Sequence, residues 1–293
     1  MDNLVMNHKD VLSENFKNLE QIALKEKENY LNAKPFPNII FKKVFKDDYL
    51  NIILKEFPDL LTLNDSQNYH VKNEIKLSNN NYGKFPPTIK SFFDFLNSNL
   101  FLTFLQNLTS IKEKLMSDPN LEGGGLHEIK RGGTLKIHTD FNRHPFLDLD
   151  RRINVLIYLN KDWKDSYGGH LEFWNQDMSK CEKEILPSFN TMAIFSTTDF
   201  SNHGHPELLN CPKEMSRKSL ALYYFSASRP KNEIISRHKK NRTYYKNRIG
   251  VKDDADENKE YFKDFLRKFK FYQIIKDFEK KYIRRGKKKL KNK

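Results

Sequence analysis

The hydrophobic period of the sequence changes at Leu126, and this change constrains the fold more than any other feature. Between Leu126 and Ser226, apolar and polar residues alternate in short runs separated by Gly, Asn, Asp and Pro. A period of two is typical of strands with one buried face. Short strands divided by such turns indicate a jelly roll or a related two-sheet barrel. The expected strands are Leu126–Lys130, Thr134–Thr139, Ile153–Leu159, His170–Trp174, Thr191–Phe195 and Lys218–Ser226.

The residues before Leu126 have helical spacing instead. A broad apolar stripe from Phe92 to Leu108 has the width needed to cover one face of a sheet. Helices followed by strands predict an α+β fold with the helices on one face. The expected helices are 12–24, 47–57 and 87–109, the last divided at Ser98; residues 38–45 are an expected strand and the Asn-rich 62–84 an expected loop.

The positive charge of the chain is concentrated in its C-terminal part. The 293 residues carry a net charge of +14, and residues 231–293 hold 23 Lys and Arg against 9 Asp and Glu. The preceding 230 residues are balanced, with 29 of each sign. The charge therefore describes a basic tail, in which apolar spacing predicts an amphipathic helix over 257–285. Basic and aromatic residues in this tail could contact nucleic acid or an acidic partner, so a nucleic-acid-binding module is an alternative function.

Targeting and redox features point to an intracellular protein. No window approaches the roughly 18 uninterrupted apolar residues that indicate a transmembrane helix. The first nine residues lack the basic and apolar regions of a secretory signal. Cys181 and Cys211 are expected to be free thiols, which suits a reducing compartment. We therefore expect a cytoplasmic location.

The triplet His138-Thr139-Asp140 is the strongest chemical motif in the sequence. Because side chains alternate along a strand, His138 and Asp140 point to the same face and can share one metal ion. His203 would supply the third ligand from a distant part of the chain. The order His-x-Asp…His matches the facial triad that holds Fe(II) and leaves coordination positions open. A hydrolytic zinc site could use the same residues.

A cationic residue follows the third candidate ligand on a predicted strand. Alternation places Arg217 and Ser219 on one face of the strand that ends at Ser226. A guanidinium binds a carboxylate through two parallel hydrogen bonds, and the serine hydroxyl could reach the same group. This part of the sequence therefore favours a site for a carboxylate-bearing cosubstrate near the metal.

Several of these segments together resemble the prolyl 4-hydroxylase-like branch of the Fe(II)/2-oxoglutarate-dependent oxygenases. The resemblance covers about residues 35–230 and begins at Lys34-Pro35-Phe36-Pro37, which is similar to the usual start of that domain. It implies an N-terminal helical extension over 1–34, the oxygenase domain over 35–230, and the basic tail over 231–293. The matching segments are Leu126–Gly133, His138–Asp140, Arg152–Trp163, Gly168–Trp174, His203–Pro206 and Arg217–Tyr224.

The resemblance implies a fold, cofactors and roles for individual residues. The fold is a double-stranded β-helix, and the cofactors are Fe(II), 2-oxoglutarate and molecular oxygen, with ascorbate as an additional cofactor. The metal ligands are His138, Asp140 and His203, with His205 as the alternative third ligand. The far carboxylate of 2-oxoglutarate is held by Arg217 with Ser219 and Tyr158.

The implied reaction is hydroxylation of a C–H bond with release of succinate and CO2. Asp140 favours hydroxylation over halogenation, because a small residue there would open a position for halide. The expected target is a protein or peptide residue such as proline; a small molecule or a sugar is the alternative. Among the remaining residues, His127, His144 and His170 are expected at the polar surface or around the ligands, and Arg151-Arg152 in structural ion pairs.

Overall fold

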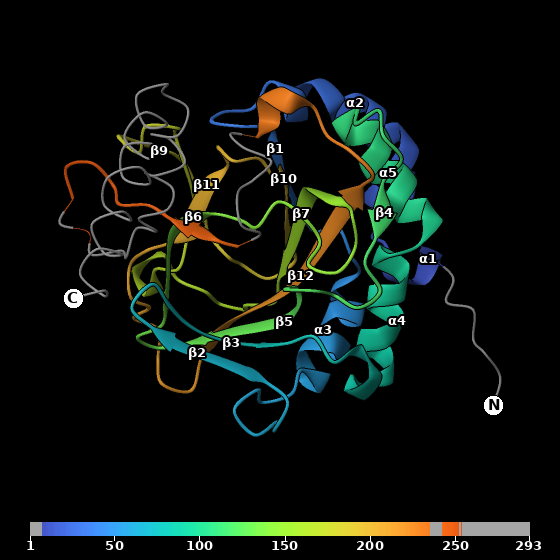
Figure 1. The fold of residues 1–293 in the computed structure, drawn as a ribbon. Helices are drawn as coiled ribbons and strands as arrows, with labels where there is room; N and C mark the ends of the chain where they lie inside the picture. Colours follow the sequence, from blue (N-terminus) through green and yellow to red (C-terminus); the bar gives the residue numbers. More distant parts are fainter. Residues whose placement is uncertain (1–7, 235–241, 252, 254–293) are drawn as a thin grey trace, which may run out of the picture.

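A computed structural model describes residues 8–234, 242–251 and 253 of the chain. Its core is a curled antiparallel sheet in the order β1-β10-β7-β12-β5-β3-β6-β11-β8-β9, to which β2, β4 and β13 are attached. The helices gather on one side of this sheet (Figure 1). This is the α+β architecture with a double-stranded β-helix that the sequence predicts. The predicted helix at 257–285 lies outside the described residues.

The strands and helices have the following bounds. The strands are β1 (Asn38–Lys42), β2 (Gln67–Val71), β3 (Glu74–Asn79), β4 (Met116–Ser117), β5 (Gly125–Lys130), β6 (Thr134–Thr139), β7 (Asp150–Tyr158), β8 (Leu171–Trp174), β9 (Cys181–Ile185), β10 (Thr191–Ser196), β11 (Asn202–His205), β12 (Ser216–Ser226) and β13 (Tyr244–Tyr245). The helices are α1 (His8–Val11), α2 (Leu19–Leu31), α3 (Asp47–Glu56), α4 (Pro87–Leu96) and α5 (Asn99–Thr109), with short 3-10 turns at 14–16, 82–84, 165–167 and 231–233.

The apolar stripe of α4 and α5 packs against the sheet as predicted. Phe92 and Phe101 are fully buried in the main core, together with Tyr224 of β12. The Tyr224 hydroxyl donates to the carbonyl of Leu96, which ties the end of α4 to the central strand. Ser98 divides the two helices, and its side chain accepts from the amide of Phe101 at the start of α5. Removing one of these buried rings should cost about 3–5 kcal/mol of stability.

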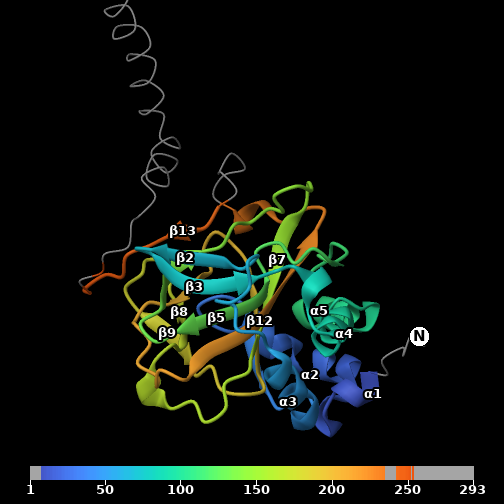
Figure 2. The ribbon, with the colours of Figure 1, turned by 90° about the horizontal axis from the view of Figure 1, so that it is seen from below.

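The long strands β7 and β12 lie in the middle of the sheet, and their pairing determines which residues of neighbouring strands lie opposite one another. Ser219 of β12 lies opposite Tyr158 of β7 and opposite His127 of β5. At the other end of the sheet order, β11 lies between β6 and β8. Figure 2 shows from below how the β2–β3 hairpin and β13 lie along the end of the barrel away from the helices. The curl brings β12 and β11 to one interior cavity, which both strands line.

Two expectations about local structure are wrong. The predicted helix over 12–24 is replaced by a 3-10 turn at 14–16 and by α2, which runs to Leu31. The Asn18 side chain accepts from the amide of Gln21 and starts α2 later than the apolar spacing suggests. The predicted loop over 62–84 contains the β2–β3 hairpin. Most of β2 is exposed, so its residues show no hydrophobic alternation, and it is held by its pairing with β3.

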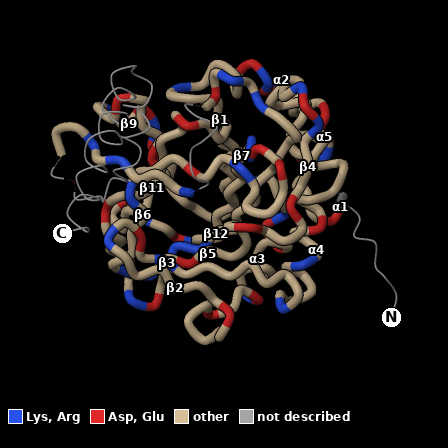
Figure 3. Tube along the Cα trace, in the orientation of Figure 1, with Lys and Arg blue, Asp and Glu red and all other residues tan. Residues whose placement is uncertain are grey.

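Charged residues of both signs are spread along the described chain. Figure 3 shows Lys and Arg interspersed with Asp and Glu over the helices and the sheet. This agrees with the balance of 29 positive and 29 negative residues up to residue 230. Among the residues described, no helix is both long and apolar enough to cross a lipid bilayer.

Candidate metal centre

Two neighbouring strands bring the three predicted metal ligands together. The strands β6 and β11 pair antiparallel, with His203 directly opposite His138. His138 Nε2 lies 3.6 Å from Asp140 Oδ1, and His203 Nε2 lies 3.4 Å from Asp140 Oδ2. The three ligand atoms all lie within 4.8 Å of one another. Metal–ligand bonds of about 2.0–2.2 Å would draw such atoms to about 3 Å apart, so only small movements separate this arrangement from a coordination shell.

Hydrogen bonds from the two imidazoles fix which nitrogen faces the centre. Nδ1 of His138 lies 2.8 Å from the carbonyl of Lys136, and Nδ1 of His203 lies 2.9 Å from the carbonyl of Ser201. Because a carbonyl oxygen only accepts, each Nδ1 atom carries a proton and donates it, which turns each Nε2 atom towards the centre. Burial lowers the pKa of His203 to about 4. The imidazole is therefore neutral at physiological pH, as a metal ligand must be.

Asp140 is held as a carboxylate by two buried donors. Its Oδ2 accepts from Arg151 Nη2 at 3.0 Å and from Asn154 Nδ2 at 2.7 Å. Burial alone would raise the pKa of this carboxyl, but the positive Arg151 and the two imidazoles outweigh burial and hold the pKa well below its usual value. The Arg151 guanidinium stacks between Phe141 and Tyr223, 4.3 and 3.3 Å from their ring centroids.

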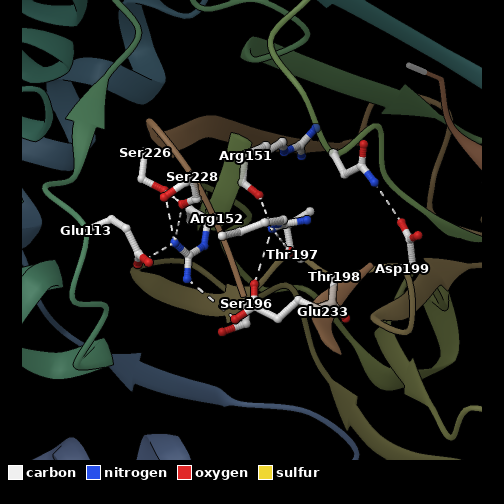
Figure 4. Close-up of polar contacts among 12 residues, drawn as sticks. Glu113, Arg151, Arg152, Ser196, Thr197, Thr198, Asp199, Ser226, Ser228 and Glu233 are labelled. Carbon is white, nitrogen blue, oxygen red and sulfur yellow. Dashed lines mark hydrogen bonds and ion pairs between the residues drawn. The ribbon is translucent and has the colours of Figure 1, made fainter. Parts of the chain in front are cut away.

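The adjacent Arg152 belongs to a different network. Consecutive strand residues face opposite sides, so Arg151 turns towards the cavity while Arg152 turns away from it. Arg152 donates to Glu113 at 2.9 Å and to Glu233 at 3.4 Å (Figure 4). The prediction of structural ion pairs for both arginines is confirmed. Sequence alone could not tell which of the two supports the metal centre.

The strand β11 is irregular between the two candidate third ligands. The register shifts between His203 and His205, so that His205 lies opposite Leu135. Gly204 sits between them, and a Cβ atom there would lie 2.7 Å from the carbonyl oxygen of Leu135. The ligand atoms that cluster with His138 and Asp140 come from His203. His205 lines the same cavity, and the described residues give neither of its ring nitrogens a hydrogen-bond partner.

Arg217 lies in the same cavity, which has a volume of about 290 Å³. Its side chain is buried, its Nε donates to the carbonyl of Gly169 at 2.8 Å, and its Nη2 donates to the Tyr158 hydroxyl at 3.2 Å. Among the residues that the structure describes, no carboxylate lies within ion-pair distance of this guanidinium. A buried cation without a counter-ion is costly, which suggests that an anionic ligand completes the site.

The other predicted cosubstrate residues surround Arg217 in different ways. Ser219 lines the cavity, whereas Tyr158 contacts Arg217 and is not among the lining residues. His127, expected at the surface or around the ligands, is buried and lines the cavity. Within the described chain its Nε2 has no hydrogen-bond partner. Burial is the main cause that holds the pKa of His127 well below its usual value, so the ring is neutral.

Part of the cavity lining comes from segments that the sequence patterns do not assign to the site. Tyr69 and Glu74 come from the β2–β3 hairpin, and Arg242 and Tyr245 come from the segment around β13. The hairpin was missed because β2 is exposed and polar. The one signal for β13 was the pair of tyrosines interrupting a basic run.

One comparison with known proteins matches part of the chain to a family. Residues 124–225, which are 102 of the 293 residues, match the family model described as the 2OG-Fe(II) oxygenase superfamily. The matched segment contains the clustered His138, Asp140 and His203, and also Arg217 and Ser219. That family implies Fe(II), 2-oxoglutarate and O2 as cofactors. A comparison with curated proteins gives no match.

Solved structures of prolyl hydroxylases share the fold of this oxygenase. A prolyl 4-hydroxylase from Phytophthora capsici is 19% identical with a TM-score of 0.50, over 73% of this chain and 66% of that one. The chain thus spans slightly less than two thirds of that relative. A prolyl hydroxylase from Trichoplax adhaerens, in complex with a hypoxia inducible factor oxygen degradation domain peptide fragment, is 16% identical with a TM-score of 0.50, over 71% of this chain and 90% of that one.

Proposed function

We propose that this oxygenase hydroxylates a C–H bond of a protein or peptide residue such as proline, with 2-oxoglutarate converted to succinate and CO2. His138, Asp140 and His203 hold Fe(II), and Arg217 binds the far carboxylate of 2-oxoglutarate. The observation that carries the proposal is the cavity, which is lined by the cluster of His138, the ionised Asp140 and His203 and by the buried guanidinium of Arg217, for which the described residues offer no carboxylate partner.

The donor set fits a ferrous ion. Two imidazole nitrogens and one carboxylate form the facial triad that is typical of non-haem Fe(II) oxygenases. All three groups lie on β6, on the residue that follows it and on β11, so they would hold the ion from one side of the cavity. The Asp140 carboxylate would occupy the coordination position that a halide ion needs, which supports hydroxylation rather than halogenation.

The remaining polar groups fit the cosubstrate. The far carboxylate of 2-oxoglutarate offers several acceptor positions, and Arg217 and Ser219 are donors that line the cavity. Within the described residues neither ring nitrogen of His205 has a partner, so a neutral His205 can turn one N–H towards the ligand. Tyr158 acts indirectly: its hydroxyl accepts from Arg217 and its ring lies 4.9 Å from the guanidinium, so it orients that group.

The mechanism follows from what the chain's own residues do. Bound iron, with 2-oxoglutarate and oxygen, supplies the oxidising power that breaks the C–H bond. Arg151 and Asn154 keep Asp140 ionised and fix its orientation. The buried walls exclude water and hold the cosubstrate at a fixed distance from the ligands. The peptide substrate is supported by the fold shared with the peptide-bound Trichoplax adhaerens enzyme.

Cosubstrate binding and turnover test this proposal together. Purified protein is titrated with Fe(II) and 2-oxoglutarate without oxygen, and the Fe(II)–2-oxoglutarate absorption band is recorded. Succinate is then measured in air with ascorbate, which we propose as the reductant that keeps the iron ferrous. His138→Ala should abolish both signals, and His70→Ala, an exposed histidine on β2, should retain both. A wild-type protein that gives neither band nor succinate would refute the oxygenase assignment of the site.

A further inference from the structure

The segment around β13 covers part of an edge that would otherwise be open on β6. The strand β3 pairs with β6 at Thr134 and Leu135 only. Further along the same strand, Tyr244 pairs with Thr139 and Tyr245 pairs with His138. The amide of Lys246 then donates to the carbonyl of Ile137 at 2.8 Å. A strand from beyond residue 230 therefore occupies the part of the β6 edge that carries the metal ligands.

This pairing places side chains of the segment at the metal end of the cavity. Residues directly opposite one another on antiparallel strands project to the same face, so Tyr245 points to the same side as His138. The ring centroids of these two residues lie 5.6 Å apart. The Tyr245 hydroxyl donates to Glu74 of β3 at 3.1 Å, and Arg242 also lines the cavity. The segment thus lines the cavity beside the metal ligand His138.

Contacts beyond β13 fasten the segment mainly through polar groups. Arg248 forms ion pairs with Glu207 at 2.8 Å and with Asp253 at 2.9 Å. Asp253 in turn lies 3.4 Å from the ammonium of Lys136. The strand itself has two residues, of which Tyr244 is buried and Tyr245 half-buried, whereas the apolar side chains beyond it, Ile249 and Val251, are exposed. The part beyond β13 therefore has few buried apolar contacts, which is a property of segments that open locally without global unfolding.

We propose that the β6 edge at Ile137–Thr139 is the docking site of an extended polypeptide substrate, and that β13 is an intramolecular occupant which this polypeptide replaces. The inference rests on the proposed function and names how its substrate binds. A strand edge presents main-chain donors and acceptors in a row that another extended chain can satisfy, with alternate side chains pointing to one face. A substrate residue opposite His138 would therefore project to the same face as His138, as Tyr245 does here.

A proline substitution in the full-length protein tests the replacement. Lys246→Pro removes the N–H that donates to Ile137, and Lys246→Ala keeps it. The probe is a fluorescent peptide with the chain's own sequence 242–251, followed by anisotropy, with a scrambled peptide as control. Losing one backbone hydrogen bond shifts the competition by about tenfold, so the probe should bind Lys246→Pro about ten times more tightly than Lys246→Ala. Amides of residues 242–251 should also exchange faster in the proline variant.

Equal probe affinity for the proline and alanine variants would overturn the proposal, as would equal binding of the scrambled peptide. If Lys246→Pro does not fold, Tyr245→Ala decides by the same criterion against Tyr245→Phe, because the alanine variant loses the ring contact with His138 and the phenylalanine variant keeps it. Probe binding and amide exchange need neither iron nor 2-oxoglutarate. A failure of the cosubstrate titration therefore counts against the proposed function alone, and a failure of probe binding counts against the docking edge alone.

Discussion

The polar residues of the cavity form two groups, one around Asp140 and one around Arg217, which differ in where their hydrogen-bond partners come from. Around Asp140, the protein itself provides the hydrogen-bond partners: Arg151 and Asn154 on the carboxylate, and backbone carbonyls on the Nδ1 atoms of both ligand histidines. Around Arg217, the described chain leaves Nε2 of His127 and both ring nitrogens of His205 without partners and the guanidinium without a carboxylate.

This difference separates a preorganised metal site from a site that its ligand completes. The metal ligands are oriented before any ion binds, so substitutions among them should act on the metal. The groups around Arg217 are buried without a full set of hydrogen-bond partners in the described chain. An anion that forms those hydrogen bonds should therefore bind tightly and stabilise the fold.

Substitutions of His203 and His205, the two histidines of β11, should distinguish the metal site from the cosubstrate site most clearly. His203→Ala should lose stoichiometric iron and reduce succinate formation to background, because a two-ligand site with a buried carboxylate binds Fe(II) weakly. His205→Ala should keep its iron and weaken 2-oxoglutarate binding by about tenfold, the effect of one lost hydrogen bond. Iron content and anaerobic 2-oxoglutarate titration measure the two effects. Loss of iron in His205→Ala with iron retained in His203→Ala would reverse the assignment.

A substitution at Arg217 should change cosubstrate affinity and leave the metal in place. Arg217→Gln removes the charge from a buried hydrogen-bonded position, for which about 1.5–3 kcal/mol is typical. We expect 2-oxoglutarate to bind roughly 10- to 150-fold more weakly, with iron content unchanged. Arg131→Gln is the matched control, because Arg131 contacts Asn210 and a backbone carbonyl away from the cavity. Equal losses in both variants would remove Arg217 from the cosubstrate site.

The neighbouring arginines of β7 provide a second matched pair. Arg151→Met should lower Fe(II) affinity about 10- to 100-fold, because it removes a donor that orients Asp140. Arg152→Met should instead lower the free energy of unfolding, because it leaves Glu113 and Glu233 without their common partner. Metal titration and urea unfolding of both variants distinguish the two roles. Similar iron affinities in the two variants would mean that Arg151 does not act through Asp140.

Acid should destabilise the metal-free protein. Burial lowers the pKa of His127 and brings the pKa of His203 to about 4, whereas an unfolded histidine titrates near 6.5. Above pH 6.5 both states are neutral and nothing is lost. As the pH falls below 6.5, the unfolded chain binds protons that the folded chain does not, and each such histidine costs up to about 1.4 kcal/mol per pH unit until its folded pKa is reached.

Urea unfolding of the metal-free protein at pH 7.5, 6.5 and 5.5 measures this slope. His127→Gln should make the slope shallower by about one proton, while His70→Gln, at an exposed position of β2, serves as the control. A free energy of unfolding that rises as the pH falls over this range would contradict the neutral, buried state of these rings.

The sequence predicted what local periodicity encodes. Alternation along β6 put His138 and Asp140 on one face, and the apolar stripe of α4 and α5 indicated the helical layer correctly. The hairpin β2–β3 could not be predicted in this way, because an exposed strand held by main-chain pairing has no hydrophobic pattern. The strand β11 could not be predicted from a hydrophobic pattern either, because its residues Asn202–His205 include no aliphatic side chain.

Contacts between distant segments were also beyond the sequence. His127 was expected at the surface or around the ligands because nothing near it in the chain indicates the cavity that β12, β11 and β6 close around it. The assignment of the basic tail to a separate part over 231–293 remains a prediction. Within it, β13 pairs with the strand that carries His138, a long-range contact that a basic, Tyr-containing run does not encode.

The bulge at Gly204 has a consequence for mutational tolerance. Gly204 bears no functional group, yet a methyl group at this position would lie 2.7 Å from the carbonyl oxygen of Leu135 and 2.9 Å from that of Lys136. Lys136 supplies the carbonyl that orients His138, so pressure at Gly204 is transmitted to a ligand on another strand. A saturation-mutagenesis screen for loss of iron should therefore recover substitutions at Gly204 as well as at the ligands themselves, because this position has no room for a side chain.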